Sequence, residues 1–475
     1  MKNKFNNLTS KEWLPFQKSW FKFEDWLKLY EDNICFFTKK ENDNEVVYYS
    51  GPENSLFEQV VKKNGLSSLN DLERANCIIQ YALIDLMDKI TPETTLKEYE
   101  KIQGDVLNEV KIIYNLLSDR RFITVLIPNI EREGSFYPFA WDLAKEITSI
   151  CSLKDEKIGC FESPLVDNDN KEYFNTNKST FYCLYFRKDD NGGKDFKQLH
   201  SSYFTNTKQL PAKITFQQTF PQWFILKPKP RKKDEILHPA KYPEDLVDMC
   251  VQHFTKENDN VFDPMAGTGS TQLGALRNKR NGYGTELSDF FAGIANGRCK
   301  EYLEPSQLAL FGDKKEQDFK ILCKDARTVS KDDFPEMDYI LTSPPYWDML
   351  NMKGAENQAK RLEKGLQTNY SKSDRDLGNI NDYDEFLNEL SEIYISLLDI
   401  LKPGGYMTIV VKNIKKQGKN YPFAWDLANK LQNYVILLPE FFWCQDDISI
   451  APYGYGNTWV SNTFHQYCLN FQKPL

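Results

Sequence analysis

The sequence lacks any pair of cysteines in Cys-x-x-Cys spacing, although it contains 10 cysteines in 475 residues. Such pairs are the usual ligands of structural zinc, and disulfide frameworks belong to short secreted chains. The spacing therefore excludes a zinc ribbon, and the length and scatter exclude a disulfide scaffold. We expect reduced thiols in an intracellular protein, and no bound metal.

Long apolar runs are also missing. No stretch approaches the roughly 18 apolar residues that a membrane helix needs, and the opening "MKNKFNNLTSKEW" has no apolar signal-peptide core. We expect a cytoplasmic protein without a membrane partner.

An excess of basic residues is absent as well. The net charge is −8 and the isoelectric point is near 5.4, so any contact with nucleic acid must come from local basic patches. Aromatic residues make up 14% of the chain, which favours large cores over base-stacking surfaces.

The second half of the chain alternates apolar runs with amphipathic segments, as a parallel α/β sheet does. Strands are expected within 260–267, 280–288, 319–327, 337–346, 406–414 and 462–473. Helices are expected within 270–279, 288–303, 383–405 and 421–434. The length allows two or three domains, and residues 201–475 are predicted to form an α/β domain with a mostly parallel central sheet.

The first half repeats part of this layout. The octapeptide "YPFAWDLA" occurs at 137–144 and again at 421–428, and from Phe122 and Tyr406 onward the two copies differ by a constant 284 positions. Later, "STFYCLYFRK" echoes "FHQYCLNFQK". Two copies are too few for a solenoid. The pattern predicts an internal duplication in which residues 1–200 are a degenerate copy of half of the domain at 201–475.

The degenerate copy is expected to lack the chemistry. We align "VVYYSGPENS" (46–55) with "DYILTSPPYW", which sets Gly51 and Glu53 at or near the first proline and the tyrosine. The second half has a glycine-rich loop at 261–271, and the sequence before residue 46 has no such loop. The first copy is therefore expected to bind no cofactor. Pro128 stands where the second copy has Lys412. Its role is expected to be target recognition, a dimer-like surface or structural support.

A glycine loop, "VFDPMAGTGST" (261–271), follows a strand and opens a helix. Gly267 and Gly269 allow a ligand to approach the backbone closely at the helix N-terminus. Glu286 ends the next strand, where an acid grips ribose hydroxyls in such sheets. A dinucleotide site needs a third glycine, and Gln272 stands there instead. S-adenosylmethionine, which has an adenosine but no phosphate, fits better.

"DPMAGTGST" followed by "TSPPY" resembles the paired motifs of amino-group DNA methyltransferases, in which an S-adenosylmethionine-dependent, Rossmann-like domain methylates cytosine N4 or adenine N6. "LHPAKYPEDLVDMC" (237–250) resembles the segment that holds the methionine end, and Asp325 in "CKDAR" matches the acid that reaches the adenine amine. The resemblance covers about 200–475. The expected cofactor-binding residues are Asp263, Met265, Ala266, Gly267, Thr268, Gly269, Ser270, Glu286, Leu287, Asp325 and Ala326.

The resemblance gives "TSPPY" a chemical role. An exocyclic amine is a poor nucleophile, because its lone pair is delocalised into the ring, so two acceptors must orient its hydrogens. Ser343 Oγ and the carbonyl of Pro344, made rigid by Pro345, can supply them. The base must be flipped out of the duplex, and Tyr346 then stacks on it, with help from Trp347. Serine before Pro-Pro-Tyr favours cytosine N4 in this family, and adenine N6 stays open.

Recognition of DNA is expected from residues 1–200, from the polar insert 348–382, or from both. The insert carries Lys353, Lys360, Arg361 and Lys372, and we predict that it orders on DNA, although a solvated loop is the alternative. "KPKPRKK" (227–233), with Arg231 and Lys232, could follow phosphates or be a solvated linker.

The sequence therefore predicts a site-specific methyltransferase acting on double-stranded DNA, with a restriction endonuclease as a candidate partner. Its rivals are an RNA amino-methyltransferase and a non-catalytic DNA-binding protein that keeps the fold.

Overall fold

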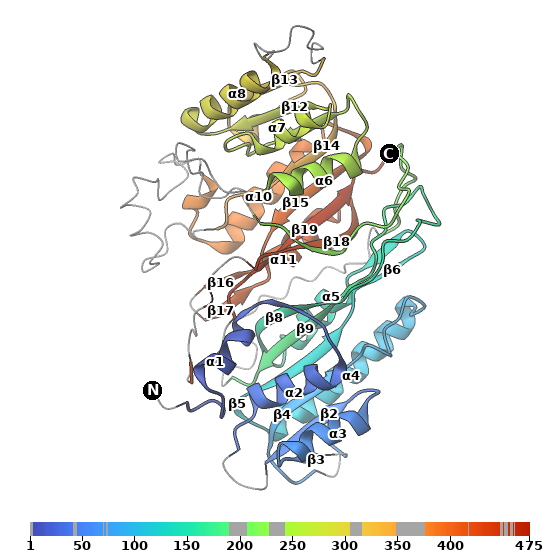
Figure 1. The fold of residues 1–475 in the computed structure, drawn as a ribbon, viewed down its shortest axis with the longest axis vertical. Helices are drawn as coiled ribbons and strands as arrows, with labels where there is room; N and C mark the ends of the chain where they lie inside the picture. Colours follow the sequence, from blue (N-terminus) through green and yellow to red (C-terminus); the bar gives the residue numbers. More distant parts are fainter. Residues whose placement is uncertain are drawn as a thin grey trace.

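The computed structural model describes residues 3–475 except 41–44, 70, 73–74, 190–206, 228–242, 305–315, 348–375, 417, 447–449, 451–454, 457–458 and 460. The described chain forms two α/β domains that lie end to end along the long axis of the molecule (Figure 1). The first sheet takes its strands from residues 20–187 and the second from 223–472.

The second sheet has eight strands in the order β10-β18-β19-β15-β14-β11-β12-β13. Neighbouring strands are parallel except at β19, which is antiparallel to β15 and β18. The strands are β10 (Trp223–Ile225), β11 (Asn260–Asp263), β12 (Asn281–Glu286), β13 (Phe319–Cys323), β14 (Met337–Thr342), β15 (Leu401–Val411), β18 (Ile436–Cys444) and β19 (His465–Gln472). The predicted α/β fold with a mostly parallel sheet is confirmed.

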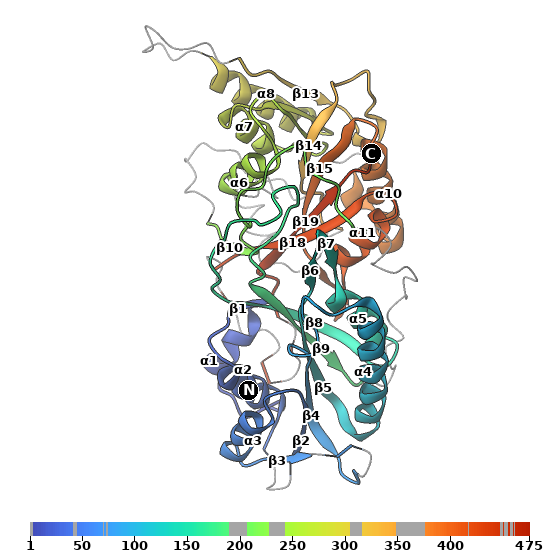
Figure 2. The same cartoon turned by 90° about the vertical axis from the view of Figure 1, so that its right-hand side faces the viewer.

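Helices cover both faces of this sheet. One face carries α6 (Glu244–Phe254), α7 (Ser270–Arg277) and α8 (Asp289–Leu303), and the other carries α10 (Tyr383–Leu397) and α11 (Phe423–Leu431) (Figure 2). This is the doubly wound arrangement of a Rossmann-like domain, in which ligands bind at the carboxyl ends of the strands.

The first sheet has seven strands in the order β1-β8-β9-β5-β4-β2-β3. When the edge strand β13 is left out, the strands of the second sheet have the same order of parallel and antiparallel pairs. Its strands are β1 (Trp20–Lys22), β2 (Val46–Ser50), β3 (Ser67–Leu69), β4 (Ile79–Asp85), β5 (Leu117–Ile127), β8 (Ser152–Cys160) and β9 (Thr180–Arg187). Its helices are α1 (Ser10–Trp13), α2 (Trp26–Phe37), α3 (Asn54–Lys63), α4 (Leu96–Leu116) and α5 (Phe139–Ile147).

The prediction of a half-domain copy is therefore wrong in its extent. Strands β1, β2 and β3 occupy the places of β10, β11 and β12, so the first domain repeats nearly the whole sheet. The sequence of residues 20–69 has diverged so far from that of the second domain that only the shared topology relates the two segments.

The alignment of "VVYYSGPENS" with "DYILTSPPYW" is also wrong. Val46–Ser50 form β2, which corresponds to β11, so the segment after it replaces the glycine loop. Tyr81 pairs with Phe122 as Tyr339 pairs with Tyr406, and this register sets Asp85 in the place of Ser343. The true counterpart of "SPPY" is thus "DLMD" at 85–88.

Equivalent helices begin in similar ways. Helix α4 begins with a capping box, in which Thr95 accepts from the Glu98 amide and the Glu98 carboxylate accepts from the Thr95 amide. Helix α10 begins with Asp382, whose side chain accepts from the Glu385 amide. The proline of each "YPFAWDLA" copy has nearly the same backbone angles, φ −80° and ψ 60° in the first and φ −78° and ψ 60° in the second.

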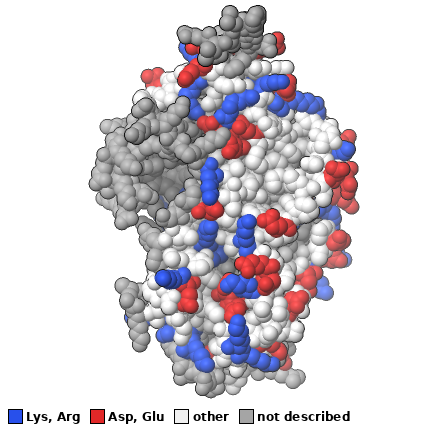
Figure 3. All heavy atoms as spheres, in the orientation of Figure 1, with Lys and Arg blue, Asp and Glu red and all other residues white. Residues whose placement is uncertain are grey.

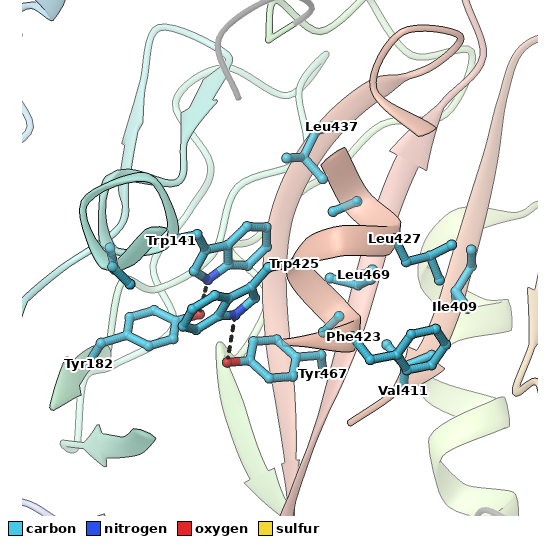
Figure 4. Packing of buried hydrophobic residues seen from close by; sticks show 14 of the residues in the cluster. Trp141, Tyr182, Ile409, Val411, Phe423, Trp425, Leu427, Leu437, Tyr467 and Leu469 are labelled. Carbon is cyan, nitrogen blue, oxygen red and sulfur yellow. Dashed lines mark hydrogen bonds between the residues drawn. The ribbon is translucent and has the colours of Figure 1, made fainter. Parts of the chain in front are cut away.

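The duplicated octapeptides lie against each other between the domains. The rings of Trp141 and Trp425 stack across the boundary, and each indole N–H donates to a tyrosine of its own domain, Tyr182 or Tyr467 (Figure 4). Both tyrosines reach across the boundary: Tyr182 donates to Glu440 and Tyr467 donates to Glu156. Glu440 and Glu156 stand at equivalent positions of the two copies, because their numbers differ by 284. The two contacts are therefore related by a pseudo-twofold axis.

The same symmetry governs a pair of asparagines. Asn129 accepts from the Ala140 amide and donates to Glu440 at 3.0 Å, while Asn413 accepts from the Ala424 amide and donates to Glu156 at 2.6 Å. The hairpin β6 (Ile130–Arg132) and β7 (Ser135–Tyr137) follows the first asparagine, and β16 (Ile414–Lys416) and β17 (Lys419–Tyr421) follow the second. The boundary has the organisation of a symmetric dimer interface within one chain.

The domains also exchange a large aromatic side chain. Phe174, from the loop before β9, is fully buried in the second domain against Phe216 and Phe254. Trp459, from the equivalent loop before β19, is 1% exposed and packs in the first domain against Phe36 and Tyr185. Each hydrophobic core is therefore completed by a side chain of the other domain.

Candidate active site

The two predicted motifs meet at one edge of the second sheet. Strands β11 and β14 are parallel neighbours, so the loops that follow them leave the sheet side by side. The hydroxyl of Thr271, in the first turn of α7, donates to Asp263 Oδ2 at 2.8 Å and approaches the carbonyl of Leu341 at 3.4 Å. One side chain thus ties the glycine loop to the strand that carries Ser343.

The glycine loop has a left-handed backbone at both of its glycines. Gly267 has φ 53° and Gly269 has φ 78°. A Cβ on Gly269 would lie 2.9 Å from Cβ of Ala295 in α8, so close helix packing also requires glycine there. The Met265 amide donates to Asp263 Oδ1, which fixes the start of the loop. Of the remaining predicted loop residues, Ala266, Thr268 and Ser270 are buried.

Glu286 ends β12 and faces this loop. Its carboxylate accepts from the amides of Gly267 at 2.8 Å and Ser288 at 2.9 Å. Burial raises the pKa of Glu286, and the nearby charges of Asp263 and Asp376 raise it further. Asp376 is buried and caps the 3-10 turn η3 (Leu377–Asn379). Sequence reasoning missed Asp376, because no motif marks it.

Asp325 stands at the end of β13, where the predicted acid is expected. Its side chain accepts from the Arg327 amide and forms an ion pair with the Arg327 guanidinium at 3.3 Å. Ala326 is buried in the 3-10 turn η2 (Ala326–Thr328), and the carbonyl of Leu287 lies near Cys323 Sγ. The predicted cofactor residues therefore line the carboxyl ends of three neighbouring strands.

The Thr-Ser-Pro-Pro-Tyr corner follows β14 directly. Thr342 is the last strand residue and is fully buried, while Ser343 is partly exposed. Tyr346 is half-buried, and its hydroxyl donates to Gln466 Oε1 at 2.6 Å. Burial raises the pKa of Tyr346, so the phenol stays neutral at physiological pH.

Trp347 packs beneath the corner. It is 4% exposed, its indole N–H donates to the Asn381 carbonyl, and its ring contacts those of Tyr383 and Tyr421. The ammonium of Lys416 lies 4.0 Å from the centre of the Trp347 ring. The role of Trp347 at the target base stays a prediction.

A lysine that sequence reasoning passed over faces the same corner. Lys412 follows β15, and its ammonium lies 5.0 Å from the centre of the Tyr346 ring. Burial lowers the pKa of Lys412 to about 8. Its type and position after a buried strand were the available signal, but in sequence it looked only like a difference from Pro128.

The equivalent position in the first domain is filled by its own side chains. Tyr49 stands in the place of Asp263, and Asp85 in that of Ser343. Tyr30 donates to Asp85 at 2.7 Å and lies 3.0 Å from the Tyr49 hydroxyl. A Cβ on Gly51 would lie 2.4 Å from that hydroxyl, so aromatic rings occupy the volume of a glycine loop.

The predicted basic contacts Lys353, Lys360, Arg361, Lys372, Arg231 and Lys232 lie outside the described residues. On the face seen in Figure 3, acidic and basic side chains are interspersed. No group of metal-binding side chains occurs among the residues that the structure describes. Over the same residues, no helix is both long and apolar enough to cross a membrane.

Comparisons with known proteins find similarity to DNA methyltransferases. A family model described as DNA methylase matches residues 81–297, from β4 of the first domain to α8 of the second. The orphan methyltransferase M.BamHII of Bacillus amyloliquefaciens is 42% identical over 66 residues, which are 14% of this chain and 25% of that protein. The type II methyltransferase M.BglII of Bacillus subtilis is 33% identical over 73 residues, or 15% of this chain and 20% of that protein.

The chain thus spans a quarter or less of the curated relatives it matches. Among solved structures, an rRNA methylase from Streptococcus thermophilus is 10% identical with a TM-score of 0.29, covering 50% of this chain and 100% of that one. A magnesium protoporphyrin IX methyltransferase from Synechocystis is 13% identical, also with a TM-score of 0.29, covering 48% and 80%. These scores say nothing of function. These sequence matches support the resemblance to DNA methyltransferases, since residues 81–297 are similar to the DNA methylase family.

Proposed function

We propose that this protein is a DNA methyltransferase that transfers a methyl group from S-adenosylmethionine to the exocyclic amine of a flipped-out base, cytosine N4. The Thr271 hydroxyl carries the proposal, because it joins the glycine loop to the Ser343 strand. A methyl donor in the loop would therefore lie beside a base held at the Thr-Ser-Pro-Pro-Tyr corner.

The residues present fit S-adenosylmethionine. The cofactor supplies an electrophilic methyl group on a sulfonium. The left-handed glycines leave room beside the backbone, and Glu286, at the end of the neighbouring strand, is placed for ribose hydroxyls. Asp263 and Asp325 bring negative charge to a site for a ligand with a positive sulfonium and ammonium. Met265, Ala266, Thr268, Ser270, Leu287 and Ala326 complete the set proposed to bind the cofactor.

The Thr-Ser-Pro-Pro-Tyr corner binds and orients the target base. Ser343 Oγ and the Pro344 carbonyl accept the two amine hydrogens and turn the nitrogen lone pair toward the methyl group. Positive charge that develops on nitrogen is stabilised by these acceptors. A strong base is not required, since the amine proton becomes acidic as the methyl group arrives. Tyr346 supplies the stacking surface.

The first domain serves as a scaffold that completes the second domain, and the basic residues of the insert and linker contact DNA. The double-stranded DNA substrate, the cytoplasmic location and a companion restriction endonuclease belong to the same proposal.

Single-molecule sequencing of DNA from a methylation-free host that expresses the protein tests it. N4-methylcytosine at a defined motif is expected, and N6-methyladenine would select the alternative base. Tritiated methyl transfer to total RNA but not to genomic DNA would select an RNA enzyme. Absence of cofactor binding by calorimetry would leave a non-catalytic DNA-binding protein.

A further inference from the structure

Lys412 and the catalytic corner leave the sheet at neighbouring points. Strands β14 and β15 are parallel, with Thr342 opposite Ile409, so the residues after each strand lie at the same edge. The ammonium of Lys412 is 5.0 Å from the centre of the Tyr346 ring. A cation over an aromatic face is attracted by the ring quadrupole, which accounts for this position without an acidic partner.

The nearby lysines are engaged elsewhere. Lys415 pairs with Asp155 and donates to Ser461, and Lys416 lies over Trp347. Across the residues that the structure describes, the Lys412 ammonium has neither a carboxylate partner nor a hydrogen-bond acceptor. An ammonium that has unused donors beside the corner can donate to a ligand that brings an acceptor.

The first domain lacks this cation. Pro128 stands in the place of Lys412, and the segment that replaces the catalytic corner there is "DLMD". The ammonium therefore occurs in the domain that has the serine, the prolines and the tyrosine. The framework that the two domains share does not require this lysine, because the first domain folds with proline at the equivalent position. We therefore associate Lys412 with the chemistry of the corner.

We propose that Lys412 is a substrate-binding residue whose ammonium donates a hydrogen bond to the O2 carbonyl of the flipped-out cytosine. This inference rests on the proposed function. A base that stacks beside the ammonium on the Tyr346 ring would bring the lone pairs of its edge within reach of the Lys412 ammonium. Cytosine has a carbonyl on this edge and adenine has ring nitrogens alone, so Lys412 contributes to selection of cytosine.

The test compares the wild type with Lys412→Met and Lys412→Arg. Lys402→Met is the matched control, because Lys402 lies near the amino end of the same strand and pairs with Asp338. Methyl transfer is measured on a duplex with the mapped site. It is also measured on the same duplex with a 2-aminopyridine C-nucleoside as the target, which keeps the amine and the adjacent ring nitrogen but has C–H at the position of the cytosine carbonyl. Cofactor and duplex affinities are measured separately.

Lys412→Met should lower kcat about ten- to hundredfold on the natural duplex, the range for a hydrogen bond to a charged donor, with cofactor and duplex affinities unchanged. Lys412→Arg should recover part of the rate. On the analogue, wild type and Lys412→Met should be equally slow. Activity of Lys412→Met within about twofold of wild type would overturn the inference, as would a loss confined to duplex affinity, which indicates a phosphate contact. A wild type that binds cofactor but transfers no methyl group would overturn the proposed function, and this inference with it.

Discussion

The indole rings of Trp141 and Trp425 stack with their centroids 6.3 Å apart and their planes inclined by 15°. They come from the two copies of one octapeptide, so the identity of the copies reflects a shared surface at which each meets the other. Truncation of either ring should destabilise the protein by about 3–5 kcal/mol.

The free energy of the contact between the two rings can be measured separately from the cost of removing each buried ring. In a double-mutant cycle, Trp141→Ala and Trp425→Ala should couple by about 0.5–1.5 kcal/mol in denaturant unfolding. The pair Trp26→Ala and Trp425→Ala is the control, because Trp26 packs on Tyr30 inside the first domain. Strict additivity of the first pair would contradict the stacked interface.

Removal of the exchanged aromatic side chains should destabilise the domain that receives them. Trp459→Ala is expected to cost about 3–5 kcal/mol, since the side chain is 1% exposed. Hydrogen exchange should increase first in α2, around Phe36, although the mutation is in the second domain. Phe174→Ala should instead increase exchange around Phe254 in α6. Exchange that rises only in the domain of the mutated residue would argue against the reciprocal packing.

Gly269 and Gly297 should respond oppositely to alanine. Gly269→Ala forces a left-handed backbone on an L residue and a clash with Ala295, so we expect a loss of roughly 2 kcal/mol and weaker cofactor affinity by calorimetry. Gly297→Ala, where an added Cβ meets nothing within 4 Å, should stabilise α8 by about 0.5–1 kcal/mol and leave affinity unchanged. Equal effects of the two changes would show that the loop geometry is unimportant for the ligand.

Stability should fall as pH rises through the titration of Glu440. Burial raises the pKa of Glu440 to about 7, and its Oε2 has no partner among the described residues. Between its unfolded pKa near 4.3 and pH 7 the folded state holds more protons, so this group stabilises folding at low pH and loses that contribution as pH rises. Glu440→Gln keeps an oxygen that can accept from Asn129 and Tyr182. The variant should flatten the fall in unfolding free energy between pH 5 and 8, and a profile parallel to that of the wild type would refute the assignment.

Ser343→Ala should reduce methyl transfer by about 10²–10³-fold, since one acceptor of the developing charge is lost. Cofactor affinity should change little, because Glu286 and the glycine loop are intact. Ser461→Ala serves as a control for hydroxyl removal away from the corner. Full transfer by Ser343→Ala would eliminate the proposed mechanism.

The second domain could be predicted from sequence because its motifs carry backbone requirements. The left-handed angles at Gly267 and Gly269 are ones that glycine readily adopts, and Pro344 and Pro345 cannot continue a strand. The residue types therefore indicate where the strands end and the loops begin. The early part of the first domain could not be predicted, since Tyr49 replaces Asp263 and no glycine loop marks the turn after β2. Residues 46–50 are compatible with several strand positions, and only pairing with β4 selects one.

Lys412 and Asp376 escaped prediction for a different reason. Their surroundings are made by strands and turns distant in sequence, so the position of Lys412 after a buried strand was only a weak signal, and Asp376 had none.

The position of Trp459 has a consequence for synthesis on the ribosome. The first domain receives this side chain from a position 272 residues after the end of its own last strand at Arg187. The amino-terminal core therefore cannot close until the segment around Trp459 has been synthesised. A polypeptide that is interrupted before this segment leaves an open hydrophobic surface for chaperones and proteases.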